Sequence, residues 1–132
     1  MKYVIDTHAL IWFLEGNSRL GANANVILSN PDSQLVIPAT TLAEAVWIVE
    51  RGRTSIPSAE NLLSAVEADA RVVIYPLDKD VIKITMSLSA INEMHDRQIT
   101  ATALVLASES NEVQLLTCDS NITASGLVSI IW

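Results

Sequence analysis

The chain has few of the residues that would point to an extracellular, disulfide-rich or membrane-bound protein. Its 132 residues contain one cysteine, Cys118, which has no second cysteine to pair with. This count fits a reducing compartment, so we expect a cytoplasmic protein. No apolar run approaches the length of a membrane span, and Asp6, Thr7 and His8 interrupt the apolar start that a secretory signal requires. The sequence therefore predicts no association with a membrane.

Basic and aromatic residues are also scarce. Eight Lys and Arg stand against fifteen Asp and Glu, for a formal net charge of -7, whereas nucleic-acid-binding proteins usually present basic surfaces. Charge alone argues against nucleic acid, unless the carboxylates hold metal ions that reverse the local field. Half of the residues are hydrophobic but only one is Phe, which leaves aliphatic faces that one small core does not cover. We therefore expect a homodimer.

Short apolar runs alternate with helix-like stretches along the whole chain. Asn30-Pro31-Asp32 is a turn signal, and Thr41 and Glu44 have capping-box spacing. The alternation predicts one α/β domain over residues 1–132, with a mostly parallel sheet in a three-layer α/β/α arrangement. The expected strands are 2–5, 35–37, 72–75, 115–117 and 128–131, and the expected helices are 9–14, 23–29, 41–52, one starting at 57–58, 78–88 and 96–110.

Four acids occur where such a sheet would bring them together. Asp6 follows the apolar run of the first strand, Asp119 follows that of a late strand, and Glu44 and Asp96 lie near the starts of predicted helices. Strand ends and the starts of the next helices share one edge of a parallel sheet, where ligands usually bind. Carboxylate oxygens are the ligands that hard divalent cations prefer. The four acids therefore predict a site for such a cation.

Each acid also has a simpler structural explanation. Glu44 would complete the capping box, Asp96 would favour a helix N-terminus through the helix dipole, and Asp119 would be a turn residue. Asp6 is the hardest to explain in this way, because a carboxylate directly after a buried strand is costly to desolvate. Several other side chains are expected to be structural or solvated. We expect His8 and His95 to pack or hydrogen-bond locally rather than bind metal, and Cys118 to be buried rather than a ligand or nucleophile. Trp12, Phe13 and Trp47 are expected in the core or a dimer interface rather than as a base-stacking platform, and Asp78, Asp80, Glu93 and Glu112 as surface acids.

Four segments in order resemble the PIN-domain family, especially the VapC-type toxins of prokaryotic toxin–antitoxin pairs. They begin with Asp6-Thr7-His8-Ala9-Leu10-Ile11-Trp12 and continue with Leu42-Ala43-Glu44-Ala45, followed by Arg51-Gly52-Arg53. The third runs from His95-Asp96-Arg97-Gln98 to Leu104, and the fourth is Leu115-Leu116-Thr117-Cys118-Asp119 with Ile122. Met94-His95 stands where many relatives have Pro-Phe, and Cys118 where a basic residue is common. Neither departure alters an acid.

The resemblance implies a PIN-like fold and a Mg²⁺- or Mn²⁺-dependent endoribonuclease, with a cognate antitoxin as its partner. Asp6, Glu44, Asp96 and Asp119 would be the catalytic, metal-binding residues, and hydrolysis would leave a 5′-phosphate and a 3′-hydroxyl. Thr7 and Thr117 could support acids by hydrogen bonds, and Arg97 could steer phosphate or pair with an acid.

Other enzyme classes fit less well. An aspartyl phosphotransferase of the haloacid dehalogenase kind would need a second acid at position 8, where the chain has His8. A phospho-receiver would need adjacent acids after the first strand and a late lysine, which are missing. The alternative from another class is a PIN-like scaffold that binds a protein without cutting RNA. The loss of one acid would have favoured it, and all four acids are present.

Overall fold

The computed structural model describes residues 1–109 and 111–132. Within them, strands and helices alternate from the first residues to the last. In chain order the elements are β1 (Lys2–Ile5), α1 (Thr7–Glu15), α2 (Ala22–Ser29), β2 (Gln34–Pro38), α3 (Ala39–Glu50), α4 (Ala59–Ala68), β3 (Val72–Tyr75), α5 (Lys79–Thr85), α6 (Met94–Ser108), β4 (Val113–Leu116), α7 (Ser120–Ser125) and β5 (Ile130–Ile131).

The strands form one sheet in the order β3-β2-β1-β4-β5, and all of its pairings are parallel. From the central strand β1 the chain moves outward to β2 and β3, and then returns to β4 and β5 on the other side. The winding direction therefore reverses between β1 and β4. At such a point the loops at the carboxyl ends of the strands diverge and leave a crevice in which ligands bind.

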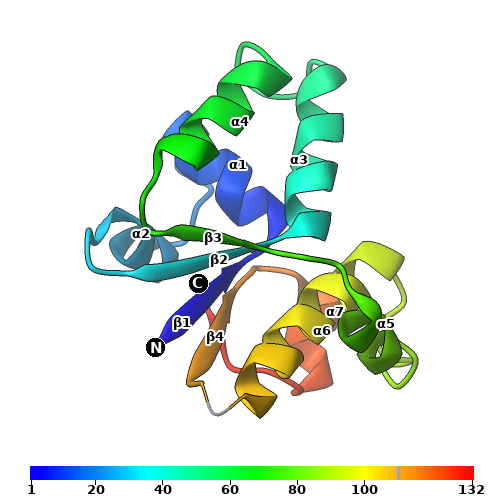
Figure 1. The fold of residues 1–132 in the computed structure, drawn as a ribbon. Coiled ribbons are helices and arrows are strands. Elements are labelled where there is room, and N and C mark those ends of the chain that lie inside the picture. Colours follow the sequence, from blue (N-terminus) through cyan, green and yellow to red (C-terminus); the bar gives the residue numbers. More distant parts are fainter. Residues whose placement is uncertain (110) are drawn as a thin grey trace.

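Both faces of the sheet are covered by helices. Helices α1, α3 and α4 lie on one face, and α5, α6 and α7 on the other (Figure 1). Val4, Val36 and Leu115 are paired in register and pack with Ile99 of α6, whereas the next residue of β1, Ile5, belongs to the core on the opposite face. Burial on both faces explains why the strands are apolar runs without polar alternation. The predicted α/β/α fold with a parallel sheet is confirmed.

Three helices begin two residues earlier than predicted: α1 at Thr7, α3 at Ala39 and α6 at Met94. Helix α3 begins at Ala39 after Pro38, not at a capping box, because the buried Thr41 hydroxyl donates to the Ile5 carbonyl oxygen at 2.8 Å and so ties α3 to the end of β1. Helix α6 begins at Met94, two residues earlier than predicted, because the Glu93 carboxylate caps it.

Other boundaries differ by a few residues. Strand β4 ends at Leu116, so Thr117 lies after the strand, and β5 is shorter than predicted. Helix α5 ends at Thr85 instead of 88, and α6 ends at Ser108. The predicted end of α6, Ser110, lies outside the described residues. Across the described part of the chain, no helix combines the length and apolar character needed to cross a bilayer.

Candidate active site at the carboxyl end of the sheet

Two of the predicted acids cap helices at the point where the winding reverses. Asp6 follows β1 and accepts from the Thr7 N–H at 2.7 Å, and Asp119 follows β4 and accepts from the Ile122 N–H at 2.8 Å. A capping carboxylate satisfies a free N–H and lies where the helix dipole favours negative charge. Because β1 and β4 are neighbours in the sheet, the two caps lie beside the same crevice.

The other two predicted acids come from helices on opposite faces of the sheet. Glu44 lies within α3, and Asp96 lies in the first turn of α6. All four line one pocket of about 250 Å³. The full lining is Asp6, His8, Ala9, Glu44, Glu93, Asp96, Cys118, Asp119 and Trp132. The fold therefore brings together side chains that are up to 113 residues apart (Asp6 to Asp119).

Two buried threonine hydroxyls donate hydrogen bonds to acids of this pocket. The Thr117 hydroxyl donates to Asp6 Oδ2 and accepts from the Asp119 N–H at 3.0 Å, so it links the two capping acids. The Thr7 hydroxyl donates to Glu44 Oε1 and links α1 to α3. In metal sites, the carboxylates that bind the ion are commonly held by hydrogen bonds of this kind.

The carboxylates of the pocket are poorly compensated. Burial, together with the charges of Asp119, Asp6, Glu93 and Glu44, raises the pKa of Asp96 to about 7. Burial also raises the pKa of Asp6, although hydrogen bonds from Thr117 and Thr7 oppose the rise. In the described part of the chain, no Lys or Arg forms an ion pair with any of these acids. Near neutral pH the pocket thus favours a proton or a cation.

Glu93 belongs to this pocket, although its sequence context suggested a surface acid. Its carboxylate accepts from the Asp96 N–H at 2.9 Å and lies 2.8 Å from His95 Nδ1, which is also 3.5 Å from Glu44 Oε2. Burial raises the pKa of Glu93, but hydrogen bonds from His95 and Asp96 outweigh this and leave it below its usual value. Glutamate is not a typical helix cap, so the sequence carried little signal for this role.

Arg97 and Cys118 differ from what the sequence predicted, whereas the two histidines make local contacts. Arg97 donates from Nε to the Ile91 carbonyl oxygen and forms no ion pair with a described acid. Cys118 is exposed at the pocket instead of buried, because β4 has already ended. His95 makes the expected local contact, with Glu93, and also lies near Glu44 of α3. The His8 ring lies 5.3 Å from the Trp12 ring.

The three aromatic residues expected in a core or interface separate into two groups. Trp12 and Phe13 are partly buried against the core that includes α1 and α3. Trp47 is 50% exposed. Trp132, which the sequence did not single out, also lines the acidic pocket. The Trp132 backbone can come this close to residue 21 because residue 21 is a glycine. A Cβ at position 21 would lie 2.5 Å from the Trp132 carbonyl carbon.

The arrangement of the carboxylates around the pocket decides how they could hold a divalent cation. Among the described residues, no three His, Cys, Asp or Glu side chains are arranged so that they could hold a metal ion as they stand. The carboxylates therefore surround the pocket rather than converge on one point. Their chemistry nevertheless fits Mg²⁺ or Mn²⁺, because they are oxygen donors and no described Lys or Arg lies within ion-pair distance of them.

The comparisons with known proteins agree with the fold. The sequence profile of the PIN domain matches residues 3–125. Comparison with curated protein sequences finds no match.

Solved structures provide likenesses over nearly the whole chain. The chain is similar to VapBC2 from Rickettsia felis, bound to a DNA fragment from its promoter, with a TM-score of 0.68, 16% identity and 99% and 98% of the two chains covered. It is similar to VapC20 from Mycobacterium tuberculosis, a sarcin–ricin loop cleaving toxin, with a TM-score of 0.67, 13% identity and 96% of each chain covered. VapBC-1 from nontypeable Haemophilus influenzae gives a TM-score of 0.67, 18% identity and coverage of 99% and 97%. At such low identities the likeness shows a shared fold.

Proposed function

This chain belongs to the PIN-domain family, and from that premise we propose that it is a metal-dependent endoribonuclease. The observation that carries the proposal is the pocket that Asp6, Glu44, Asp96 and Asp119 line together. A purely structural role for these acids does not require that they share one pocket, whereas metal-assisted hydrolysis does. The sarcin–ricin loop cleaving toxin among the structural likenesses adds support for an RNA substrate.

In this proposal Asp6, Glu44, Asp96 and Asp119 hold Mg²⁺ or Mn²⁺. The bound ion would lower the pKa of a water molecule and offset charge on the phosphate. Asp96 must lose its proton to become a ligand, which its pKa of about 7 makes easy near neutral pH. The Thr117 and Thr7 hydroxyls fix the carboxylates of Asp6 and Glu44. Because Thr7 donates to Oε1 of Glu44, the other carboxylate oxygen, Oε2, could accept a hydrogen bond from the attacking water.

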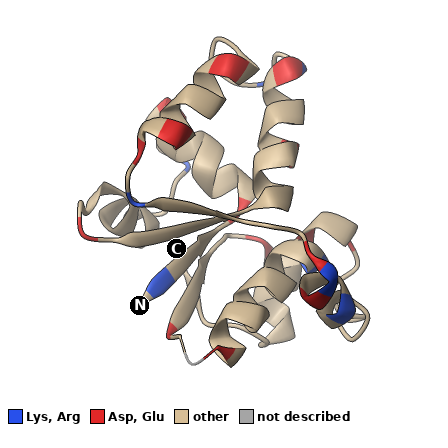
Figure 2. Ribbon diagram, viewed as in Figure 1, with Lys and Arg blue, Asp and Glu red and all other residues tan. Residues whose placement is uncertain are grey.

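The basic residues suit a short contact with RNA. Lys79 and Lys83 share α5, and Arg51 and Arg53 both follow α3, whereas the other Lys and Arg lie on separate elements or loops (Figure 2). Binding then depends mainly on the metal-loaded pocket and on a few neighbouring side chains. We expect a weaker salt dependence than that of proteins that neutralise many phosphates.

We also propose that the protein is the toxin of a type II pair and binds a cognate antitoxin. The structural likenesses include VapBC complexes, and a basic antitoxin side chain would complement the uncompensated acids. If so, Asp96→Asn and Glu44→Gln should weaken the complex. An antitoxin that binds both variants as tightly as wild type would exclude an active-site plug.

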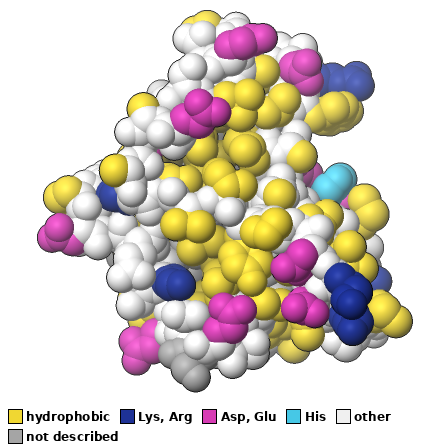
Figure 3. Space-filling model, viewed as in Figure 1, with side chains coloured by type: hydrophobic (Ala, Val, Ile, Leu, Met, Phe, Trp, Pro, Cys, Tyr) yellow, Lys and Arg dark blue, Asp and Glu magenta, His cyan; other side chains and the backbone are white. Residues whose placement is uncertain are grey.

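We propose that the chain forms a homodimer, and its exposed apolar surface supports this. Val73 and Ile74 on the edge strand β3 are 59% and 41% exposed. Hydrophobic side chains also gather on the surface over β3 and between α3 and α4 (Figure 3). An open apolar edge commonly pairs with another chain. Light scattering should show a dimer that Ile74→Lys weakens, and a strict monomer at high concentration would refute it.

The ribonuclease proposal is tested by cleavage of total RNA and of a labelled single-stranded RNA in Mn²⁺, in Mg²⁺ and in excess EDTA. Wild type should cleave with either metal, and EDTA or Asp6→Asn should abolish cleavage. Asp32→Asn, in an exposed turn before β2, is the matched control and should cleave normally. Activity that persists in EDTA, or in the Asp6→Asn variant, would refute the assignment. Tight RNA binding without cleavage under all conditions would favour the scaffold alternative.

A further inference from the structure

A second hollow, next to the acidic pocket, has a different lining. It has a volume of about 320 Å³ and is lined by Ala43, Glu44, Trp47 and His95. Glu44 lines both hollows. A group held in the second hollow would therefore lie beside the carboxylates. We call this hollow the Trp47 subsite.

One face of α3 gives the subsite its shape. Ala43 and Trp47 are four residues apart and thus neighbours on the helix surface, with Arg51 following directly after another turn. The small Ala43 leaves space beside the large indole of Trp47. Half of the Trp47 surface is exposed, although tryptophan is usually highly buried in a folded chain. The subsite therefore presents an aromatic ring to the solvent at the edge of the proposed catalytic pocket.

Arg51 adds a positive charge to this ring. Its guanidinium carbon lies over the Trp47 ring, 4.2 Å from the centroid, in a cation–π contact. Arg51 also follows the last residue of α3, where the helix dipole favours a cation. The contact restrains the indole and places a phosphate-binding group next to it. An aromatic ring with an adjacent cation is the combination by which proteins bind single-stranded nucleic acids.

We propose that the Trp47 subsite holds an unpaired nucleobase of the RNA strand whose phosphate is bound at the acidic pocket, with Arg51 contacting a neighbouring phosphate. This inference rests on the proposed ribonuclease function and narrows its substrate to RNA that is single-stranded, or looped, beside the cleaved bond. A base within a duplex is stacked on both sides and cannot offer its face to an indole.

The dimensions favour a base over a peptide. A hollow of about 320 Å³ is at the lower end of the range for pockets that bind small molecules, about 300–1,000 Å³, and suits a planar ring system. Four residues line the subsite, whereas an amphipathic peptide helix needs anchor points over several turns. The shared Glu44 also connects the subsite to the pocket where a phosphate would lie, which a separate protein-docking surface does not require.

The first test measures binding without cleavage. Asp119→Asn serves as an inactive background, and the probe is a fluorescein-labelled 12-nucleotide single-stranded RNA of mixed sequence, followed by anisotropy in Mn²⁺. Adding Trp47→Leu should weaken binding by about tenfold or more, while Trp47→Phe, which keeps a ring, should bind nearly as well as the background. Met86→Ala is the matched control, because Met86 is 81% exposed and does not line either hollow.

The second test asks whether Trp47 contacts a base or only the backbone. A series of the same RNA with one abasic position moved along the strand should contain a position that weakens binding to the Trp47-containing protein about as much as Trp47→Leu does. The same abasic RNA should bind the Trp47→Leu protein no more weakly than intact RNA does. Arg51→Met should reduce the salt dependence of binding, with normal folding by circular dichroism.

The outcomes separate this inference from the proposed function. If wild type cleaves RNA but Trp47→Leu binds and cleaves as well as Trp47→Phe, the subsite proposal is wrong. If losses from Trp47→Leu and from the abasic position add, the base lies elsewhere and the proposal also fails. If wild type neither binds nor cleaves RNA in Mn²⁺, the ribonuclease proposal itself fails.

Discussion

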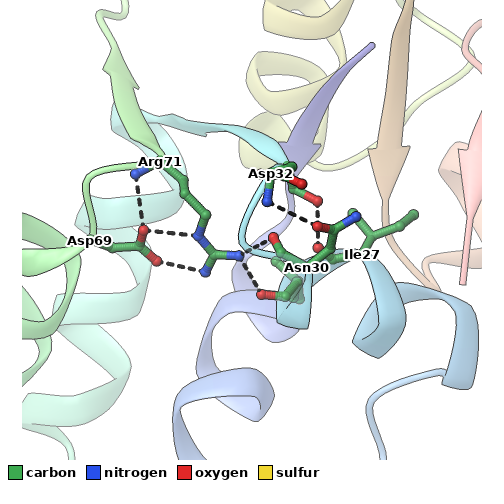
Figure 4. Close-up of polar contacts among 7 residues, drawn as sticks. Ile27, Asn30, Asp32, Asp69 and Arg71 are labelled. Carbon is green, nitrogen blue, oxygen red and sulfur yellow. Dashed lines mark hydrogen bonds and ion pairs between the residues drawn. The ribbon is translucent and has the colours of Figure 1, made fainter.

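At the amino end of the sheet the Arg71 guanidinium makes four hydrogen bonds. At the carboxyl end, the ion-pair contacts of the pocket acids among the described residues are those of His95 with Glu93 and Glu44. Arg71, just before β3, donates from Nε and Nη2 to the Asp69 carboxylate at 3.0 and 2.8 Å. Its Nη1 donates to the carbonyl oxygens of Leu28 and Asn30 at 2.8 and 2.7 Å (Figure 4). This network ties the turn after α2 to the turn before β3, and it holds the pKa of Asp69 below its usual value.

The carboxyl end has the opposite electrostatics. Asp96 has a pKa raised to about 7, and burial raises that of Asp6. His95 contacts Glu93 and Glu44, and no arginine lies within ion-pair distance of the described acids there. Desolvated like charges destabilise a folded protein unless something bound offsets them.

The difference shows that the chain is able to neutralise a carboxylate with a well-placed arginine, yet does not do so in the pocket. A bidentate arginine offers directed hydrogen bonds that fix structure, but it would also occupy the oxygens that a cation needs. The carboxyl end thus gives up some stability in the metal-free protein and keeps its oxygens free. We therefore expect substitutions at the carboxyl end to affect activity and substitutions at the amino end to affect stability.

The largest effect is expected from a pair of matched acid-to-amide changes, Asp119→Asn at the carboxyl end and Asp69→Asn at the amino end. Asp119→Asn should lower the RNA cleavage rate by about 100-fold or more, because metal assistance contributes several kcal/mol to the transition state. Its stability should hold, since asparagine caps a helix as well as aspartate does.

Asp69→Asn should give the reverse pattern, with near-normal cleavage and a lower free energy of unfolding. Cleavage rates and urea denaturation of both variants decide the matter. Loss of cleavage in Asp69→Asn, or normal cleavage in Asp119→Asn, would remove the functional distinction between the two ends.

The positions of Asp6 and Asp119 could be predicted from the sequence because both follow short apolar strands directly. In a parallel sheet, a residue that directly follows a strand is fixed at the carboxyl edge. Glu44 and Asp96 were also predicted as members of the site, because both lie near the starts of predicted helices, which share that edge with the strand ends. The family resemblance agreed with this placement. Glu93 was not, because an isolated acid in a polar stretch carries no sign of whether it faces solvent or a pocket.

The face that a helix buries was harder to predict. Helix α3 is apolar on most of its surface, so its pattern did not show that Trp47 would be half exposed. The capping box at Thr41 failed for a related reason. A threonine hydroxyl near a helix start has several possible acceptors, and here tertiary packing supplied the Ile5 carbonyl oxygen.

A second prediction concerns the hydroxyl that holds Asp6. Thr117→Val keeps the side-chain volume but removes the hydrogen bonds to Asp6 and from the Asp119 N–H. It should lower the Mn²⁺ affinity by about 10- to 100-fold, the usual cost of losing a partner that orients a metal ligand. Isothermal titration calorimetry gives the affinity. Thr117→Ser restores the hydroxyl and should recover most of it, and equal loss in both variants would indicate a packing defect instead.

A third prediction tests the amino end alone. Arg71→Met keeps much of the side-chain length and removes all four hydrogen bonds of the guanidinium. Leaving Asp69 and two carbonyls without this partner should lower the free energy of unfolding by about 2 kcal/mol. Cleavage by the folded variant should be unchanged. Arg53→Met, at an exposed arginine, is the control and should change stability by less than about 0.5 kcal/mol. Equal stabilities for the two variants would show that the Arg71 network is not stabilising.

The smallest effect is a pH dependence of the metal-free protein. The pKa of Asp96 rises from 3.8 to about 7 on folding, from burial and then from the charges of Asp119, Asp6, Glu93 and Glu44. Between these two values the folded chain holds a proton that the unfolded chain has released, so the contribution of Asp96 to stability falls as the pH rises. Because the side chain is partly exposed, solvent screening should limit the change to about 1 kcal/mol.

Asp96→Asn isolates this contribution from those of the other acids. In EDTA, the difference in unfolding free energy between the variant and wild type should shift in favour of the variant as the pH rises toward 7, measured by urea denaturation. In Mn²⁺ wild type should gain stability near pH 7 and the variant should gain much less, because the ion takes the place of the proton. A parallel pH dependence of both proteins in EDTA, with equal gains from Mn²⁺, would mean that Asp96 serves α6 alone. The raised pKa of Asp96 at the carboxyl end of the sheet would then have no connection with metal binding.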